Sequence, residues 1–325
     1  MTNTVLITGA NAGLGFESAR QIASSSRWDH IVLTARSTEK GNGARDRLVS
    51  LTGRAPSDFS VAIFDNNIPD TILDAVAALA RQGRSLDAII LNAGGMGRSD
   101  DSGLPLRLPT GLSEMFAMNV GGHAVLVHGL IDAGLLSPGA TVMLAGSEAS
   151  RGIAMMNLPA PTMPTGIGDL DATLTSVAQG THADDSYNNM VDYGLIKLIG
   201  TLWMRRLHKD HGLRALTVSP GFTAGTEAMK KLPALQQLMF RYIALPLFRL
   251  TGNAHGLEFG ARRYVQALED LALEAGGFYA SPGKGISGTL TPQSPKLQPL
   301  LADAALEEAV GRLIDREVGA RQRVA

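Results

Sequence analysis

A tyrosine and a lysine stand four positions apart in the segment Tyr193-Gly194-Leu195-Ile196-Lys197. On a helix this spacing places both side chains on one face. A free tyrosine has a pKa near ~10, too high for easy proton exchange at neutral pH, and a neighbouring ammonium lowers that value. The pair could therefore give a proton to a carbonyl oxygen as a hydride reaches the carbon. Because this spacing is common on helices and usually structural, its meaning depends on the surrounding motifs.

A glycine-rich turn near the N-terminus could hold a nucleotide. Gly9, Gly13 and Gly15 lie between an apolar run and a helical pattern. Glycines at such a turn let the backbone approach a pyrophosphate, and the following helix offers free N–H groups to the phosphates. The spacing is T-G-x-x-x-G-x-G, which differs from the G-x-G-x-x-G of the ordinary dinucleotide fingerprint. By themselves, the glycines would fit a plain strand-to-helix turn equally well.

The elements that must position these residues alternate along the chain. Continuously apolar runs predict strands buried on both faces of a parallel sheet. These runs are Thr4–Thr8, His30–Ala35, Ser60–Phe64, Asp87–Leu91, Ala140–Ala145, Arg214–Val218 and Phe278–Ala280. Helical patterns cover Gly13–Ser25, Thr38–Leu51, Pro69–Arg81, Leu112–Leu135, Asp192–His208 and Asn253–Leu273. The alternation predicts an α/β fold, a Rossmann-type doubly wound parallel sheet flanked by helices.

Three segments interrupt this alternation. Residues 151–186 are rich in Met, Pro, Gly and Thr, residues 222–251 are strongly apolar, and residues 281–301 precede a short amphipathic helix over Ala302–Val318. We interpret them as two insertions and a C-terminal tail, 281–325, on one core, so residues 1–325 are expected to form a single dinucleotide-binding catalytic domain. Residues 222–251 are expected to form a mobile lid over the substrate end of the site, with an ordinary core helix as the alternative.

Composition excludes several classes of function. Apolar residues make up 45% of the 325 residues, as in a globular protein, and the net charge of −1 implies no broad attraction to nucleic acid or to an anionic membrane. The chain has no cysteine, which excludes disulfides and a thiolate nucleophile and is compatible with the cytoplasm. No apolar run approaches the length of a membrane span, and we expect no metal site. These features predict a cytoplasmic protein without an integral membrane segment.

Six motifs, in their order along the chain, resemble those of the short-chain dehydrogenase/reductase family. The first is the glycine-rich turn, for which T-G-x-x-x-G-x-G is the usual form in that family. Further matches follow in chain order and cover roughly residues 4–280. They are Asn92-Ala93-Gly94, Asn119, Ser147, Tyr193 with Lys197, and Pro220-Gly221. The resemblance implies an oxidoreductase that moves a hydride between a nicotinamide and a carbonyl or alcohol carbon.

The resemblance also implies a role for each catalytic residue. Tyr193 is the acid and base, and Lys197 lowers its pKa and holds the nicotinamide ribose. Ser147 hydrogen-bonds the substrate oxygen, and Asn119 anchors a water that links Lys197 to solvent. The family usually has two consecutive serines where this chain has Gly146-Ser147, so Ser150 stays open as the alternative catalytic serine.

The end of the second strand bears on the choice of cofactor. An acidic residue there binds the ribose 2′-OH of NAD, whereas a basic one suits the 2′-phosphate of NADP. Arg36 presents a planar donor fork suited to phosphate, and Lys40 lies one turn on. The cofactor is therefore predicted to be NADP(H). Its predicted binding residues are Gly9, Asn11, Ala12, Gly13, Leu14, Gly15, Arg36, Lys40, Asp65, Asn66, Asn92, Ala93, Gly94, Tyr193, Lys197, Pro220, Gly221, Phe222 and Thr223.

The long segment before Tyr193 resembles that of carbonyl reductases, retinol dehydrogenases and protochlorophyllide reductases. The protochlorophyllide enzymes carry a functional cysteine just after the Pro-Gly motif, where this chain has Phe222. That departure favours a carbonyl or alcohol reaction on a small lipophilic substrate. The position five residues past Pro220 is Gly225 instead of the usual threonine, so either Thr223 or Thr226 is expected near the nicotinamide amide.

Two other classes of function compete with an enzyme. One is a non-catalytic NADP(H)-binding redox sensor, which would not need the proton donor Tyr193. The other is an interaction protein that docks through residues 222–251. We also expect a monomer, because residues 151–186 lead into the helix that carries Tyr193 and could cover its outer face.

Overall fold

Among the residues that the structure describes, the sheet contains eight strands in the order β3-β2-β1-β4-β5-β6-β7-β8. The structure is a computed structural model that describes residues 3–184, 187–223 and 256–322. The strands are β1 (Thr4–Ile7), β2 (His30–Ala35), β3 (Phe59–Ile63), β4 (Leu86–Leu91), β5 (Leu136–Ala145), β6 (Arg214–Val218), β7 (Phe278–Ala280) and β8 (Thr291–Pro292). Strands β1 to β7 pair in parallel, and β8 runs antiparallel to β7. The predicted Rossmann-type sheet is confirmed, and β8 is the strand that the sequence patterns did not indicate.

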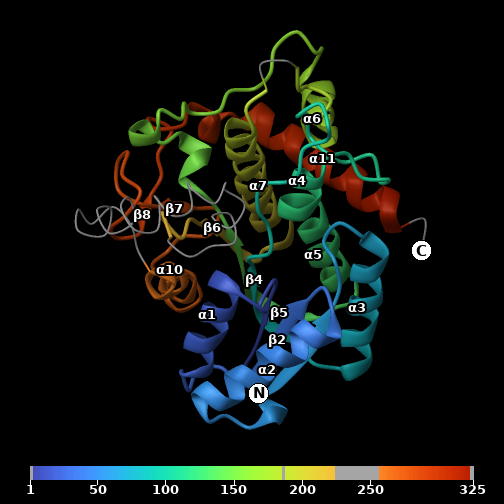
Figure 1. Ribbon diagram of the computed structural model, residues 1–325, viewed down its shortest axis with the longest axis vertical. Coiled ribbons are helices and arrows are strands. Elements are labelled where there is room, and N and C mark those ends of the chain that lie inside the picture. Colours follow the sequence, from blue (N-terminus) through green and yellow to red (C-terminus); the bar gives the residue numbers. More distant parts are fainter. Residues whose placement is uncertain (1–2, 185–186, 224–255, 323–325) are drawn as a thin grey trace.

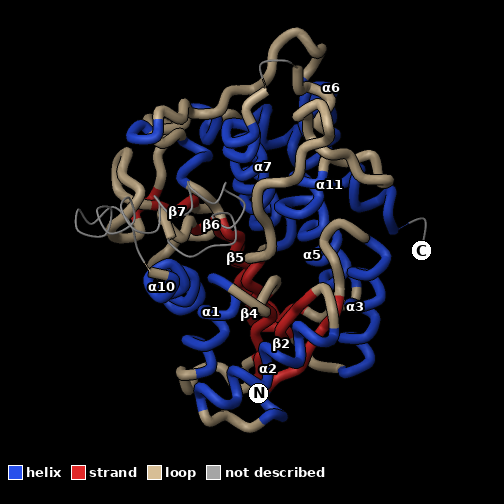
Figure 2. Tube along the Cα trace, in the orientation of Figure 1, coloured by secondary structure: helices blue, strands red, loops and turns tan. Residues whose placement is uncertain are grey.

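Helices cover both faces of this sheet (Figures 1 and 2). One layer holds α1 (Gly13–Ala23), α2 (Thr38–Thr52) and α10 (Leu257–Glu269), and the other holds α3 (Pro69–Gln82), α5 (Gly122–Asp132) and α7 (Asn189–His211). Neighbouring residues on β1 point to opposite cores: Leu6 packs with the α3–α5–α7 layer, whereas Val5 and Ile7 pack with the α1–α2–α10 layer. Burial on both faces explains why the strand sequences are continuously apolar.

The predicted helix over Leu112–Leu135 is interrupted in the structure. A short helix α4 (Glu114–Phe116) leads into a π-helical turn, η2 (Ala117–Gly121), and only then into α5. The Asn119 side chain causes the interruption, because its Nδ2 donates to the Met115 carbonyl at 2.8 Å and to the Gly95 carbonyl at 2.7 Å. Such single π turns often occur at functional sites.

The segment 151–186 contains a helix that the sequence patterns did not predict. Helix α6 (Leu170–Gln179) begins after Asp169, whose side chain caps Ala172 N, and ends at Gly180 with φ +72°. It packs against the C-terminal helix α11 (Ala304–Gln322), which also crosses α5 and α7 (Figure 1). A capping aspartate and a left-handed glycine thus mark the two ends of this helix.

The predicted lid over residues 222–251 lies, from residue 224 on, outside the described residues. Within the described part, no helix is both long enough and apolar enough to cross a membrane.

Candidate functional site

The turn between β1 and α1 has the geometry of an anion cradle. Gly9 and Gly13 adopt left-handed backbone angles, with φ of +64° and +57°. A Cβ on Gly15 would meet the carbonyl oxygen of Gly9, so only glycine fits where the turn closes. Ala12 precedes α1 and gives no side-chain cap, which leaves the first N–H groups of the helix available to a phosphate. These residues fit the pyrophosphate of a dinucleotide.

A polar chain joins this turn to the end of β4. Asn92 Nδ2 donates to the Thr8 carbonyl at 2.9 Å, and the Ala93 N–H donates to Thr8 Oγ1 at the same distance. The buried His123 imidazole lies between Thr8 Oγ1, at 3.1 Å, and the Asn119 carbonyl, at 3.3 Å. Burial lowers the pKa of His123 to about 3, so the ring is neutral. The network links the glycine turn to the π-helical turn.

The ends of β2 and β3 lie beside the same turn. Arg36 follows β2, its side chain is 67% exposed, and its Nη1 lies 4.0 Å from the Asp65 carboxylate after β3. Lys40, in the first turn of α2, is also exposed. The Asn66 side chain donates to the Met118 carbonyl at 3.0 Å and supports the π-helical segment. An exposed, weakly paired guanidinium can turn toward a phosphate at little cost.

Helix α7 carries Tyr193 and Lys197 to the end of β5. Lys197 Nζ lies 5.6 Å from the centre of the Tyr193 ring and donates to the Ala145 carbonyl at 2.8 Å. A Cβ on Gly194 would lie 2.5 Å from the Ala149 carbonyl oxygen. The glycine therefore lets α7 approach the 3₁₀ turn η3 (Glu148–Arg151), which begins directly after Ser147.

The structure distinguishes the two serine candidates. The Ser147 hydroxyl lowers the pKa of Tyr193, and it accepts a hydrogen bond from the Ala149 N–H at 3.1 Å. Ser150 is fully buried, and its hydroxyl has no hydrogen-bond partner within the described part of the chain. Of the two serines, Ser147 is therefore the one that acts on Tyr193.

Burial acts on both members of the Tyr193–Lys197 pair. It raises the pKa of Tyr193 to about 12, against the hydrogen bond from Ser147, and the Glu148 carboxylate raises it further. Burial also lowers the pKa of Lys197 to about 7. Desolvation disfavours the phenolate and the ammonium alike, so the net shift of the Tyr193 pKa is upward, and the expectation that Lys197 lowers this pKa stays a prediction.

The Pro220-Gly221 turn closes the site after β6. Gly221 has φ +77°, and Phe222 N donates to the Ile286 carbonyl at 2.8 Å. Thr223 is buried, and its hydroxyl donates to the carbonyls of Pro220, at 3.3 Å, and Gly221, at 3.2 Å. Thr226 and Gly225 lie outside the described residues.

The predicted site residues therefore gather at one edge of the sheet, because they follow the carboxyl ends of six neighbouring parallel strands. In strand order 3-2-1-4-5-6 they are Asp65 and Asn66, Arg36, Gly9 to Gly15, Asn92 to Gly94, Ser147, and Pro220 to Thr223. Open α/β sheets bind their ligands at this edge. Asn119, Tyr193 and Lys197 reach it from the π-helical turn and from α7.

Sequence reasoning missed a group of buried polar residues next to Ser147. Glu148 and Arg263 form a buried ion pair, and Ser219 and Ser281 donate to Glu148. The one signal in the sequence is Glu148 itself, an acidic residue between apolar and small residues at the end of a strand.

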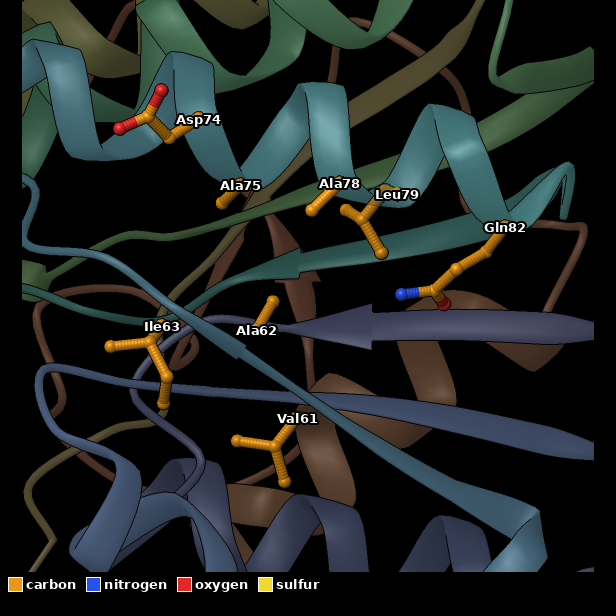
Figure 3. A pocket seen from close by; sticks show the side chains of 8 residues that line it. All are labelled: Val61, Ala62, Ile63, Asp74, Ala75, Ala78, Leu79 and Gln82. Atoms are coloured by element: carbon orange, nitrogen blue, oxygen red, sulfur yellow. The ribbon is translucent and has the colours of Figure 1, made fainter.

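The shallow pocket in Figure 3 lies elsewhere, between β3 and α3. Its lining is mostly apolar, and the Asp74 carboxylate points away from the strand (Figure 3). It is lined by Val61, Ala62, Ile63, Asp74, Ala75, Ala78, Leu79 and Gln82. This hollow brings together no groups that could transfer a proton or hold a nucleotide.

The chain is similar in sequence to known dehydrogenases and reductases. The family model described as short chain dehydrogenase matches residues 3–157. Protochlorophyllide reductase A of Oryza sativa subsp. japonica is 27% identical over 298 residues, which cover 86% of this chain and 72% of that protein. The short-chain dehydrogenase anuI of Penicillium roqueforti is 38% identical over 122 residues, which cover 38% of this chain and 46% of that protein.

Solved structures show the same fold. The NADPH-bound carbonyl reductase from chicken fatty liver superimposes with a TM-score of 0.56 at 17% identity, covering 88% of this chain and 99% of that one. Its likeness concerns the fold alone at this identity. Since the ordered motifs, the sheet and the matched relatives agree, the chain belongs to the short-chain dehydrogenase/reductase family.

Proposed function

We propose that the protein is an NADP(H)-dependent oxidoreductase that transfers a hydride between the nicotinamide and a ketone, an aldehyde or a secondary alcohol. The observation that carries this proposal is the gathering of Ser147, Tyr193 and Lys197, whose Nζ lies 5.6 Å from the centre of the tyrosine ring, at the sheet edge that holds the glycine turn. Two hydroxyl groups converge there on the position that a carbonyl oxygen would take.

Each residue has a task in this mechanism. A nicotinamide bound at the edge would supply or accept the hydride. Ser147 and Tyr193 orient the carbonyl oxygen, and Tyr193 gives it a proton during reduction or removes the alcohol proton in the reverse direction. Lys197 donates to the Ala145 carbonyl, and this hydrogen bond holds its Nζ beside the tyrosine ring. Asn119 keeps the π-helical turn and the Gly95 loop together, through Nδ2 and through Oδ1, which accepts from Gly95 N at 3.1 Å.

Arg36 supports NADP(H) over NAD(H). The side chain is exposed and only weakly paired with Asp65, so it is free to meet a 2′-phosphate. The chicken protein, which shares the fold, is described as NADPH bound.

An apolar wall beside Tyr193 supports a lipophilic substrate. Tyr193 packs against Ile153 and Leu158, from the start of the 151–186 segment, and against Ile286 of the tail. Met155 and Met156, which lie between Ile153 and Leu158 in the chain, are 50% and 47% exposed. Such a surface suits an apolar ketone better than a sugar.

We also propose a monomer. Helix α11 packs along α7 and α5, so this part of the tail covers the outer face of the helix that carries Tyr193. The sequence argument assigned that cover to residues 151–186, but α6 of this segment packs chiefly on α11.

The decisive experiment follows NADPH absorbance during incubation with a panel of ketones and aldehydes of increasing size. Consumption of NADPH that depends on the ketone, with a higher kcat/KM than for NADH, is the expected result. Binding of NADPH without turnover of any carbonyl would favour the redox sensor. Turnover of protochlorophyllide, with no carbonyl reduced, would instead favour the activity named for the Oryza relative.

A further inference from the structure

The carboxylate of Glu148 lies in the interior directly behind Ser147. The residue is 4% exposed. Its Oε1 accepts from Ser281 Oγ at 2.8 Å and from Ser281 N at 3.2 Å, and its Oε2 accepts from Ser219 Oγ. Ser219 directly follows β6 and Ser281 directly follows β7, so one carboxylate joins the segments that leave β5, β6 and β7.

The guanidinium of Arg263 approaches the same carboxylate from α10. Arg263 is 3% exposed, and its Nη1 lies 3.6 Å from Glu148 Oε1. Nη1 donates to the Ser219 carbonyl at 3.0 Å, and Nη2 donates to Ser281 Oγ at 3.1 Å and to the Gly288 carbonyl at 2.6 Å. A buried ion pair survives only with such additional hydrogen bonds, because desolvation of both charges is costly.

Arg263 also supports the Pro220-Gly221 turn. A Cβ on Gly221 would lie 2.9 Å from Arg263 Nη1, so the guanidinium lies directly under this backbone. Ser219 Oγ, which donates to Glu148, accepts from Gly221 N at 3.2 Å. A shift of the ion pair would therefore move the turn that follows β6.

The same shift would move Ser147. Glu148 is its immediate neighbour and opens the turn η3, in which Ser147 Oγ accepts from Ala149 N. Arg151, at the other end of η3, donates from Nη2 to the carbonyls of Ser281, at 3.2 Å, and Gly285, at 2.6 Å. Both ends of η3 are thus tied to the segment after β7.

We propose that Glu148 and Arg263 are positioning residues that hold Ser147 and the Pro220-Gly221 turn at their catalytic spacing, an inference that rests on the proposed hydride transfer. The pair sets geometry on the substrate side through η3 and on the cofactor side through Gly221. It also sets the electrostatic field at Tyr193. Among the described residues, the ionisable groups around Tyr193 are Lys197, Glu148 and Tyr264, and Arg263 and Arg151 lie around Glu148.

The first test substitutes Glu148→Gln, with Glu307→Gln as the matched control. Glu307 is also buried, and it is ion-paired to Lys209 near the other end of α7. Glu148→Gln should lower kcat about tenfold to a hundredfold, since small misplacements of reacting groups have effects of this size. It should also raise the Kd for NADPH severalfold, whereas Glu307→Gln should change neither.

The pH dependence of ketone reduction distinguishes a positioning role of the Glu148–Arg263 pair from a merely stabilising one. The Glu148 carboxylate raises the pKa of Tyr193, so its removal should move the basic limb of ketone reduction to lower pH. Arg263→Met leaves that carboxylate without its counter-ion and should move the limb to higher pH. A merely structural pair would lower the melting temperature of both variants and shift neither limb.

The outcomes are distinct for the two proposals. If the wild-type protein reduces no carbonyl, the proposed function fails, and the NADPH Kd of Glu148→Gln still tests the pair. If the wild type is active and Glu148→Gln behaves as Glu307→Gln does, the positioning proposal is overturned. Should Glu148→Gln not fold, Ser281→Ala removes one donor from the same carboxylate, and an unchanged kcat and Kd in that variant would equally overturn it.

Discussion

Two buried charge sites flank Tyr193 and differ in how they are paired. Lys197 is 3% exposed and donates to one backbone carbonyl, that of Ala145, with no carboxylate within ion-pair distance among the described residues. Glu148, 4% exposed, faces Arg263 and accepts from two serines. The burial is similar, but the first site has no counter-ion among the described residues, whereas the second joins a carboxylate to a guanidinium.

This difference shows which site can change its protonation. Burial lowers the pKa of Lys197 to about 7, because desolvation disfavours the ammonium. Strong perturbation of this kind clusters at functional sites. The Glu148–Arg263 pair is held from several elements and suits a fixed geometry instead. We therefore assign proton chemistry to the Tyr193–Lys197 side and positioning to the Glu148–Arg263 side.

Tyr193→Phe should have the largest effect, because it removes the proton donor between the two sites and keeps the ring. We expect kcat for ketone reduction to fall about a hundredfold to ten-thousandfold with the NADPH Kd unchanged. Tyr279→Phe, which removes another tyrosine hydroxyl, one that donates to the Glu274 carbonyl at 3.3 Å, serves as the control. Near-native turnover by Tyr193→Phe would show that the assignment of proton chemistry is wrong.

Lys197→Met tests the unpaired site through stability. From pH 7 to 10.5 the unfolded chain holds the lysine proton that the folded protein lacks, so the free energy of unfolding should rise with pH. The Lys197→Met variant lacks this rise. Its free energy of unfolding should exceed that of the wild type by a few kcal/mol below pH 7, and the difference should shrink above pH 7. Above pH 10 the raised pKa of Tyr193 makes the free energy of unfolding fall with pH in the wild type and the variant alike. Urea denaturation without cofactor across this range gives the answer, and parallel slopes would contradict a neutral lysine.

Ser147→Ala and Ser150→Ala compare two serines on either side of Glu148. Removing the Ser147 hydroxyl should lower kcat about tenfold to a hundredfold, because a substrate-orienting donor is lost. Ser150 has no partner in the described part, so its loss should leave kcat within about twofold of wild type. Steady-state kinetics of the two variants side by side would reverse the assignment if Ser150→Ala were the slower enzyme.

Arg36→Asp extends the comparison to an exposed charge on the same sheet edge. The aspartate would replace a phosphate-binding fork and would repel Asp65, so NADPH should bind about tenfold more weakly and NADH no worse. Fluorescence titration with both nucleotides measures the change, with Lys40→Gln as the milder comparison. Equal losses for NADPH and NADH would argue against recognition of a 2′-phosphate.

Local sequence patterns predicted most of the fold. The strands from β1 to β7 and the helices α1, α2 and α3 appear near the expected ranges, because apolar runs and helical periodicity are properties of neighbouring residues. The patterns failed where a distant side chain intervened. Asn119 bonds to Gly95 and turns one predicted helix into α4, a π turn and α5.

The sequence by itself determined the order of the motifs and hence the sheet edge at which they meet, because parallel strands bring their carboxyl ends together. Only the tertiary structure placed Ser147, rather than Ser150, beside Tyr193 and brought Arg263 and Ser281 to Glu148. Glu148 and Ser281 are 133 positions apart in the chain. Periodicity carries no information over such a separation, since these contacts form only when α10 and β7 pack on the completed sheet.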